Sequence, residues 1–375
     1  MNSRQRVLKT LNLEEPDKIP IDMGSTENTT LCKFAYINLR EYLHMPPDPE
    51  PYVINRMMDS IFPADDMLER YQIDFKAVRP SSAYKPDIQE LSDGFIDEYE
   101  IRWRQTKYYY DMVEHPLAEK PLEQLENAAY ADPYIPERRI GLREQAKDLF
   151  NNTDYCITVG HIAMGPFEMS GNMRSYTKFL MDLYINPDYA GSLLDKNLEN
   201  TIGFWDVYLD EVGDYVDVVC QGDDLGTQIG PWISPDMYRK WIKPRHAELF
   251  KFIRSKTDAK IFLHSCGSVY DLIPDLIEVG VQALNPVQIS AKYMDLRTLK
   301  KNFGDVLCFW GGGVDTQKVL PNASVQEIKD HVKEVIDIMA PGGGFVWVPV
   351  HNVQSDIPPE KIHAAYQTAI DNRDY

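Results

Sequence analysis

The chain has 375 residues, of which 43% are hydrophobic, and it carries a formal net charge of −19 at pH 7. This length and apolar content suffice to bury a large core, and the acidic balance argues against a nucleic-acid-binding surface. No stretch is apolar over the length of a membrane span, and the polar N-terminus lacks the apolar core of a secretion signal. The 5 cysteines are scattered, which favours a reduced, cytoplasmic protein over a disulfide framework.

The N-terminal part of the chain departs from a simple repeat. Residues 1 to about 70 look helical and rich in proline, which predicts an N-terminal helical extension packed on the main fold. Residues 93–113 predict two antiparallel strands around a turn and include three consecutive tyrosines at 108–110. We expect this hairpin insertion to form a lid or a wall near the mouth of the main fold.

Short apolar runs then alternate with helix-like stretches up to the C-terminus. The predicted strands are residues 73–78, 157–159, 216–220, 261–263, 282–285, 306–310 and 345–350. The predicted helices include residues 177–183, 190–205, 235–253, 269–279 and 325–339. Repeated strand–helix units indicate a parallel sheet with helical crossovers. Because no linker-like break interrupts them, we expect one α/β domain over residues 1–375, a (β/α)8 TIM barrel; an open doubly wound sheet is the alternative.

Polar side chains follow most of the predicted strands, at the ends where barrel enzymes place their chemistry. In chain order they are His161 and Glu168, Asp223 and Asp224, His264 and Cys266, Asn285 and Gln288, Asp315, and His351 and Asn352. Their convergence on one rim predicts a functional site there. The aspartates could instead serve as helix N-caps.

The segment His264-Ser265-Cys266 ends a buried strand, so the imidazole and the thiol are expected to point to the same side. His351 closes the last predicted strand and is the natural third ligand of a zinc site with one open position. The alternative is an inert buried cysteine and a His351 that hydrogen-bonds substrate without any metal. Glu168, Asp223 and Asp224 are candidates for a fourth ligand, for orienting the imidazoles, or for acid–base work.

Several longer segments carry a resemblance to a known family. They are SRQRVLKTLNLEEPDKIPI, GHIAMGPFEMS, GDDLGTQIGPWISPDMYRKWIKPR, HSCGSVYDLIPDLIEVGVQALNPVQ, FWGGGVDTQ and VPVHNVQSDIPPEKI. Together they resemble the uroporphyrinogen decarboxylase superfamily over essentially the whole chain. The resemblance implies a (β/α)8 barrel with its site at the C-terminal mouth, and related barrels can pair as homodimers.

This superfamily contains two functional groups of enzymes, the porphyrinogen decarboxylases and the cobalamin-dependent methyltransferases, and their characteristic residues differ. The porphyrinogen decarboxylases carry an arginine-rich RQAGR segment where this chain reads IDMGSTENTT, and a pyrrole-binding aspartate where it reads FKAVRP. The decarboxylases also have a tyrosine in the loop after the second strand, where this chain has Asn172. Of these decarboxylase residues, only the C-terminal histidine is present here, as His351. The cobalamin-dependent methyltransferases share His264 and Cys266, but their third zinc ligand is a cysteine in a PGCG-like loop, where this chain has His351.

The resemblance therefore implies a zinc-dependent methyltransferase that demethylates a small methoxylated or methylamine-type donor. No Asp-x-His-x-x-Gly signature occurs, so we expect the corrinoid (cobalamin) to be carried by a partner protein. Transfer in the other direction, to a thiol carrier, stays open. The alternatives are a metal-free decarboxylase or lyase that uses His351 with Asp223 and Asp224, and a non-catalytic binding protein. Candidate substrate contacts are Arg79, His161, Asn285, Gln288 and Asn352.

Overall fold

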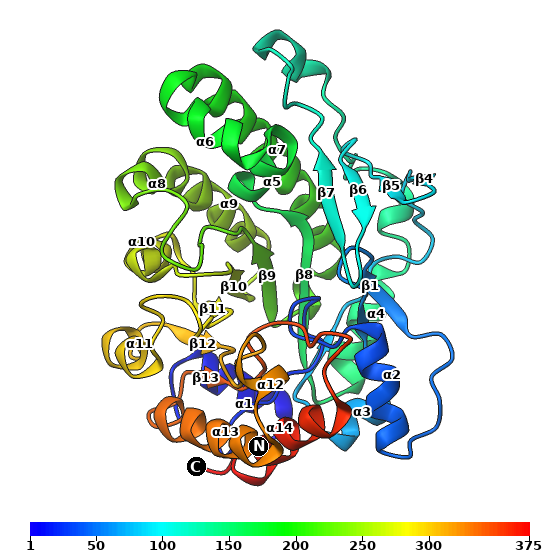
Figure 1. The fold of residues 1–375 in the computed structure, drawn as a ribbon, viewed down its shortest axis with the longest axis vertical. Helices are drawn as coiled ribbons and strands as arrows, with labels where there is room; N and C mark the ends of the chain where they lie inside the picture. Colours follow the sequence, from blue (N-terminus) through cyan, green and yellow to red (C-terminus); the bar gives the residue numbers. More distant parts are fainter.

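The computed structural model describes residues 1–375, apart from the side chain of His161. Seven parallel strands form one curled sheet in the order β13-β12-β11-β10-β9-β8-β3 (Figure 1). Their bounds are β3 Phe75–Ala77, β8 Cys156–Met164, β9 Val218–Gly222, β10 Lys260–His264, β11 Ala283–Asn285, β12 Cys308–Trp310 and β13 Phe345–Val346. Each of the predicted strands is therefore confirmed, with ends that differ by a few residues.

The N-terminal segment closes the barrel between the two edge strands. Ile21 forms a parallel bridge with Trp347, directly after β13. On its other side the backbone N–H of Asp74, directly before β3, donates to the Ile21 carbonyl at 3.0 Å. This segment takes the place of an eighth strand, so the barrel prediction is confirmed over the open sheet. The N-terminal extension is thus partly built into the barrel itself.

Helices cover the outside of the curled sheet (Figure 1). Their bounds are α4 Leu142–Asn152, α5 Pro166–Arg174, α6 Tyr176–Ile185, α7 Pro187–Val212, α8 Pro235–Trp241, α9 Lys243–Lys256, α10 Ile273–Val279, α11 Leu296–Phe303, α12 Val319–Asn322, α13 Val325–Met339 and α14 Pro359–Asp371. Short 3-10 turns occupy η1 Leu122–Asn127, η2 Pro136–Arg138, η3 Gly213–Tyr215 and η4 Tyr270–Leu272. None of the described helices combines the length and the apolar character needed to cross a membrane.

The single helix predicted over residues 235–253 is wrong, because the structure divides it into α8 and α9 around Ile242. Pro244 lies in the first turn of α9 and has no backbone N–H, so it cannot continue the hydrogen-bond ladder of α8. Ser234 caps the first of the two helices by accepting a hydrogen bond from the Met237 N–H.

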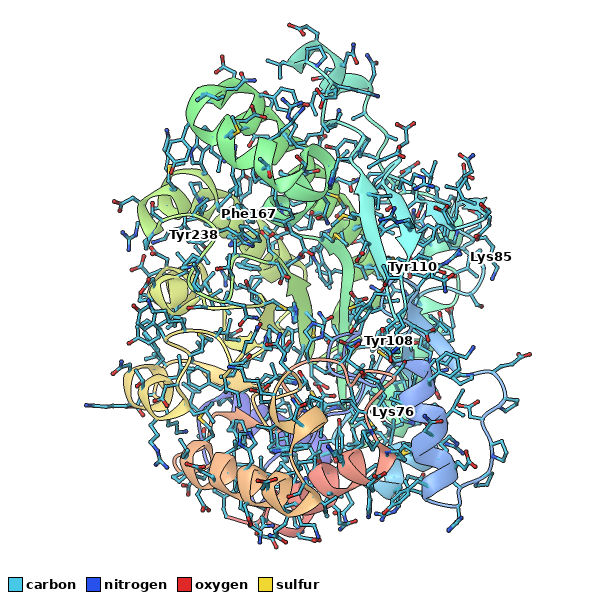
Figure 2. The ribbon with its side chains drawn as sticks, viewed as in Figure 1. Lys76, Lys85, Tyr108, Tyr110, Phe167 and Tyr238 are labelled. Atoms are coloured by element: carbon cyan, nitrogen blue, oxygen red, sulfur yellow. The ribbon has the colours of Figure 1, made fainter. Side chains whose placement is uncertain are left out.

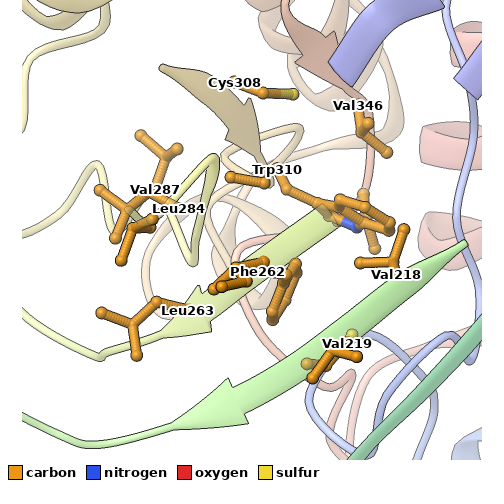
Figure 3. Packing of buried hydrophobic residues seen from close by; sticks show 14 of the residues in the cluster. Val218, Val219, Phe262, Leu263, Leu284, Val287, Cys308, Trp310 and Val346 are labelled. Atoms are coloured by element: carbon orange, nitrogen blue, oxygen red, sulfur yellow. The ribbon is translucent and has the colours of Figure 1, made fainter. Parts of the chain in front are cut away.

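Aromatic side chains fill the barrel interior (Figure 3). The Trp310 ring on β12 lies 4.6 Å from the Phe75 ring on β3 and 5.0 Å from the Phe262 ring on β10. Because these strands are not neighbours in the sheet, the contacts cross the barrel. The Trp310 Nε1–H donates to Asp22 Oδ2 at 2.9 Å, which ties the closing segment to this core. The polar residues at the ends of the strands lie outside this aromatic core, at the mouth of the barrel.

The region before β8 forms two further sheets and the remaining helices. The helices are α1 Ser3–Leu11, α2 Lys33–Tyr42 and α3 Asp65–Arg70, and β1 Tyr52–Asn55 pairs with β2 Ser60–Phe62. A four-stranded antiparallel sheet comprises β4 Gln89–Leu91, β5 Gly94–Ile96, β6 Arg102–Gln105 and β7 Tyr110–Glu114. The two-stranded hairpin predicted here is wrong. The Asp97 carboxylate accepts the N–H groups of Tyr99 and Ile101, which makes an extra turn inside the predicted segment.

Candidate metal centre

Three side chains from distant parts of the chain meet at the mouth of the barrel. His264 is the last residue of β10, Cys266 follows two residues later, and His351 lies shortly after β13. Their ligand atoms all lie within 4.8 Å of one another. The Cys266 Sγ is 3.3 Å from His264 Nε2, and the two imidazole rings are 5.4 Å apart. The structure therefore brings together the three residues predicted as metal ligands.

An asparagine fixes the orientation of His264. The His264 Nδ1 lies 2.6 Å from Asn285 Oδ1, and Asn285 Nδ2 donates to the Trp310 carbonyl at 2.7 Å. Because the amide nitrogen is committed to that carbonyl, the amide oxygen faces the imidazole and accepts its Nδ1–H. The lone pair of the neutral ring is then on Nε2, which faces Cys266.

His351 is held in the same manner. Its Nδ1 hydrogen-bonds to Asn352 Oδ1, while Asn352 Nδ2 donates to Cys32 Sγ at 3.3 Å. The Cys32 thiol donates in turn to the Met58 carbonyl at 3.2 Å. This chain of hydrogen bonds holds the Nδ1 side of the His351 ring against Asn352. Asn285 and Asn352, predicted as substrate contacts, lie behind the two histidines and orient them.

Two carboxyl groups lie beside the triad. Asp224 Oδ1 accepts the Cys266 N–H at 2.8 Å and is 3.8 Å from His264 Nε2. Glu168 Oε2 accepts the Asp224 N–H at 3.3 Å. Burial raises the pKa of Asp224, and burial together with the charge of Asp224 raises the pKa of Glu168 well above its usual range. Burial also raises the pKa of the Cys266 thiol, with Asp224 and Glu168 adding to the effect, so a thiolate would form here only with a cation beside it.

Asp223 has a different position from its neighbour. It is fully buried and accepts the N–H groups of Phe167 at 3.3 Å and Glu168 at 2.7 Å, at the start of α5. Its second contact is a 2.8 Å pair with His246 Nε2, and Tyr238 bonds to the other ring nitrogen. Figure 2 labels Phe167 and Tyr238 on this side of the barrel. Asp223 is thus placed as a helix cap that positions α5, away from the cavity lining.

A cavity of about 580 Å³ opens in front of the triad. His264, His351, Asp224 and Glu168 are among the residues that line it. The four-stranded sheet forms a facing wall, as predicted for the insertion, and Tyr110 on β7 is labelled in Figure 2. The lining residues from that wall and from the turn between β1 and β2 include Asn55, Arg56, Met57, Met58, Phe95, Asp97, Glu98, Tyr99, Ile101, Trp103, Tyr109, Tyr110 and Asp111.

The remaining predicted contacts lie elsewhere. Gln288 Oε1 accepts the Gly267 N–H at 2.6 Å and so supports the turn that follows Cys266. Gly267 has φ +83, a conformation suited to glycine. Arg79 lines a separate cavity of about 260 Å³, where its guanidinium is 5.3 Å from the Tyr52 ring. The side chain of His161 lies outside the described part of the structure.

Sequence reasoning missed the turn between β1 and β2, which brings Arg56, Met57 and Met58 to the cavity. Nothing in that short polar and aliphatic stretch marks it as part of a site. It also missed Cys32, whose role depends on a contact with Asn352 across 320 positions of sequence. The three consecutive tyrosines at 108–110 were the one available signal, and Tyr109 and Tyr110 do line the cavity.

Comparison with protein families decides the classification. The family model of uroporphyrinogen decarboxylase (URO-D) matches residues 109–371. This chain belongs to the uroporphyrinogen decarboxylase family. No curated protein matches it. Among solved structures, a methyltransferase from Methanosarcina mazei is similar to this URO-D family member with a TM-score of 0.68 and 20% identity, over 99% of each chain.

Two other solved structures are more distant from this family member. A putative vitamin-B12 independent methionine synthase from Listeria monocytogenes has a TM-score of 0.34 and 13% identity, over 58% of this chain and 64% of that one. A β-glycosidase from Thermosphaera aggregans has a TM-score of 0.42 and 11% identity, over 96% and 95%. At these TM-scores the likenesses bear on neither fold nor activity.

Proposed function

We propose that this URO-D family member is a zinc-dependent methyltransferase that moves a methyl group between a small methylated compound and the cobalt of a separate corrinoid protein. The observation that carries the proposal is the cluster of His264, Cys266 and His351, two of whose members, His264 and His351, line a 580 Å³ cavity. The fold likeness to a protein described as a methyltransferase supports it.

The donor set suits zinc. Two imidazole nitrogens and one thiolate are characteristic zinc ligands, and three protein ligands leave one position for substrate. The asparagines behind His264 and His351 match the partners that orient metal-bound histidines in known sites. Zinc held there would supply a Lewis acid for the heteroatom that carries the transferred methyl group.

In the demethylating direction, the methyl group leaves its donor heteroatom. The bond between the methyl carbon and the donor heteroatom breaks, and its electron pair stays on the heteroatom. The methyl acceptor, a corrinoid in its Co(I) state, contributes the electron pair of the new cobalt–carbon bond and becomes Co(III). The heteroatom then takes up a proton. Glu168, whose pKa is raised by burial, is placed to hold that proton at its carboxyl group beside the cavity.

A metal-free decarboxylase or lyase is supported less well. That alternative uses Asp223, which is committed to the start of α5 and to His246. A polycarboxylate substrate would also need cations in the cavity. Arg56 supplies the only arginine or lysine side chain among the described lining residues, and Glu90 binds it through two contacts of 2.6 and 2.8 Å.

The proposal is tested by methyl transfer to free cobalamin reduced to Co(I), followed by the absorbance of methylcobalamin. Zinc-loaded protein is expected to produce it from small methyl ethers or methylamines, and Cys266→Ser is expected to lose the activity. His44→Asn, at an exposed position outside the cavity lining, is the matched control and should retain it. The proposal would be contradicted if zinc-free protein transferred methyl groups as fast as zinc-loaded protein. It would also be contradicted if neither methyl ethers nor methylamines served as donors.

A further inference from the structure

The charges that line the cavity are strongly one-sided. Carboxyl groups line it from several elements: Glu27, Asp97, Glu98, Asp111 and Asp224, of which Glu98 pairs with Arg138 at 2.7 Å, and Glu168, whose raised pKa favours its neutral form. Arg56 is the one arginine or lysine among its described lining residues. A cavity with low-dielectric walls and one sign of charge favours ligands of the opposite charge. The lining therefore selects against anionic donors before any specific contact is considered.

Arg56 is already paired with a carboxylate of the chain itself. Glu90 holds its guanidinium with two contacts of 2.6 and 2.8 Å, and the guanidinium lies 4.3 Å from the centre of the Phe95 ring. The ring of Tyr110 lies 5.7 Å from it. The same contacts show that the aromatic wall already accommodates a cation of the chain itself on its ring faces.

The wall offers further aromatic surface beside its carboxyl groups. Trp103, Tyr99 and Tyr109 line the cavity with these two rings. The indole N–H of Trp103 donates to Asp97 Oδ2 at 2.7 Å, so a carboxylate lies at the edge of the aromatic ring type that binds cations best. Asp111 lies on the exposed rim of the same wall, on β7.

We propose that the methyl donor carries a positively charged ammonium group at a distance from the transferred methyl, and that this group lies against the wall formed by Trp103, Tyr110, Asp97 and Asp111. The inference rests on the proposed function, because it assigns the part of the cavity lined by His264 and His351 to the methyl group. The cationic group is separate from the methylated atom. A quaternary nitrogen has no lone pair for a Lewis acid, whereas an ether oxygen or a thioether sulfur has one.

The test uses three compounds that share one skeleton and differ in charge. They are 2-(4-methoxyphenyl)ethylamine as the cation, 2-(4-methoxyphenyl)ethanol as the neutral analogue and 4-methoxyphenylacetate as the anion. Binding to the zinc-loaded full chain is measured by titration calorimetry without any corrinoid. The aliphatic series 2-methoxyethylamine, 2-methoxyethanol and methoxyacetate repeats the comparison for a smaller donor.

The cation is expected to bind about tenfold more tightly than the neutral analogue, the anion most weakly, and the preference should shrink as salt is raised. Asp111→Asn should weaken binding of the cation about threefold and leave the neutral analogue unchanged. Asp305→Asn, at an exposed position outside the cavity lining, is the matched control. Equal or tighter binding of the neutral or anionic compound, or no binding of either cation, would overturn the inference.

The two proposals fail in different ways. Because binding is measured without a methyl acceptor, a preference for cations can be present in a protein that transfers no methyl group. If the preferred cation binds but zinc-loaded protein never methylates Co(I) cobalamin, the proposed function is wrong and the charge preference stands. If methyl transfer occurs but favours the neutral or anionic compounds, the function stands and the substrate class is wrong.

Discussion

His264 and Asn285 form a 2.6 Å hydrogen bond between Nδ1 and Oδ1, and the asparagine is itself held by the Trp310 carbonyl. The strand ends of β10 and β11 make this possible, since His264 and Asn285 are partners in their parallel register. The direction of the amide decides which ring nitrogen of His264 is protonated. A hydrogen bond between neighbouring strands thus leaves Nε2 of His264 directed toward Cys266.

Replacing Asn285 with alanine is expected to lower the affinity for zinc by about 10- to 100-fold, because the imidazole loses the partner that fixes its tautomer and orientation. Competition with a chromophoric chelator measures this affinity. Asn322→Ala, at an exposed position on α12, serves as the control and should bind zinc as the unmodified protein does. An unchanged zinc affinity in Asn285→Ala would show that the asparagine does not act through the metal.

The adjacent aspartates are expected to respond differently to the same substitution. Asp223→Asn removes a buried carboxylate that caps α5 and pairs with His246, and should lower the free energy of unfolding by about 2–4 kcal/mol. Asp224→Asn keeps an acceptor for the Cys266 N–H and should change that free energy by less than about 1 kcal/mol, while it weakens zinc binding and methyl transfer.

Urea unfolding and zinc titration of the two variants make this comparison. Equal losses of stability would mean that Asp223 has no special part in holding α5. Full zinc affinity and full activity in Asp224→Asn would remove that residue from the site.

Gly165, at the start of α5, is expected to tolerate no side chain. A Cβ added there would lie 2.3 Å from both Cβ and Cγ of Asp223, so Gly165→Ala must displace the residue that caps the helix. We expect a loss of about 1–3 kcal/mol in the free energy of unfolding, measured in urea. Gly230→Ala has open space around the added carbon and is the matched control. A Gly165→Ala variant as stable as that control would contradict the packing described here.

Much of the barrel could be predicted from the sequence because buried parallel strands read as apolar runs separated by helices. The polar residues directly after those runs, His264 and Cys266 among them, are fixed by the same local pattern. Asp223 and Asp224 show the limit of that reasoning: both follow β9, yet one faces α5 and the other the cavity. Their roles depend on a helix from another part of the chain, which local spacing does not reveal.

The closing segment of the barrel was also beyond local reasoning. Ile21 lies in a short polar stretch without strand periodicity, and it becomes strand-like only because Trp347 and Asp74 flank it. The insertion was placed correctly near the mouth, but its number of strands depends on the turn made by the Asp97 side chain. Side-chain hydrogen bonds of this kind leave little trace in hydrophobic patterning.

Asp22, in the closing segment, is expected to make stability depend on pH. Burial raises its pKa from 3.8 to about 6, against hydrogen bonds from Ser25 and Trp310 that lower it. Between these two values the folded protein binds more protons than the unfolded chain, so the free energy of unfolding falls as pH rises. The titration of Asp22 lowers the free energy of unfolding by about 3 kcal/mol in total, and this loss is complete above about pH 7.

The variant Asp22→Asn lacks this titration. The difference in free energy of unfolding, variant minus unmodified protein, should therefore rise by about 3 kcal/mol between about pH 3 and pH 7 in urea unfolding. Any constant cost of the altered hydrogen bonds cancels in this comparison. A difference that stays flat across the range would show that Asp22 keeps an ordinary pKa in the folded protein.

The zinc content of the purified protein tests the central claim most directly. Elemental analysis, after purification without chelators, would compare the unmodified chain with His264→Ala, Cys266→Ala, His351→Ala and the control His44→Asn. We predict close to one zinc ion per chain in the unmodified protein and the control, and its loss in each of the three cluster variants. A zinc-free unmodified protein that still transfers methyl groups, or full zinc occupancy in the cluster variants, would contradict the account.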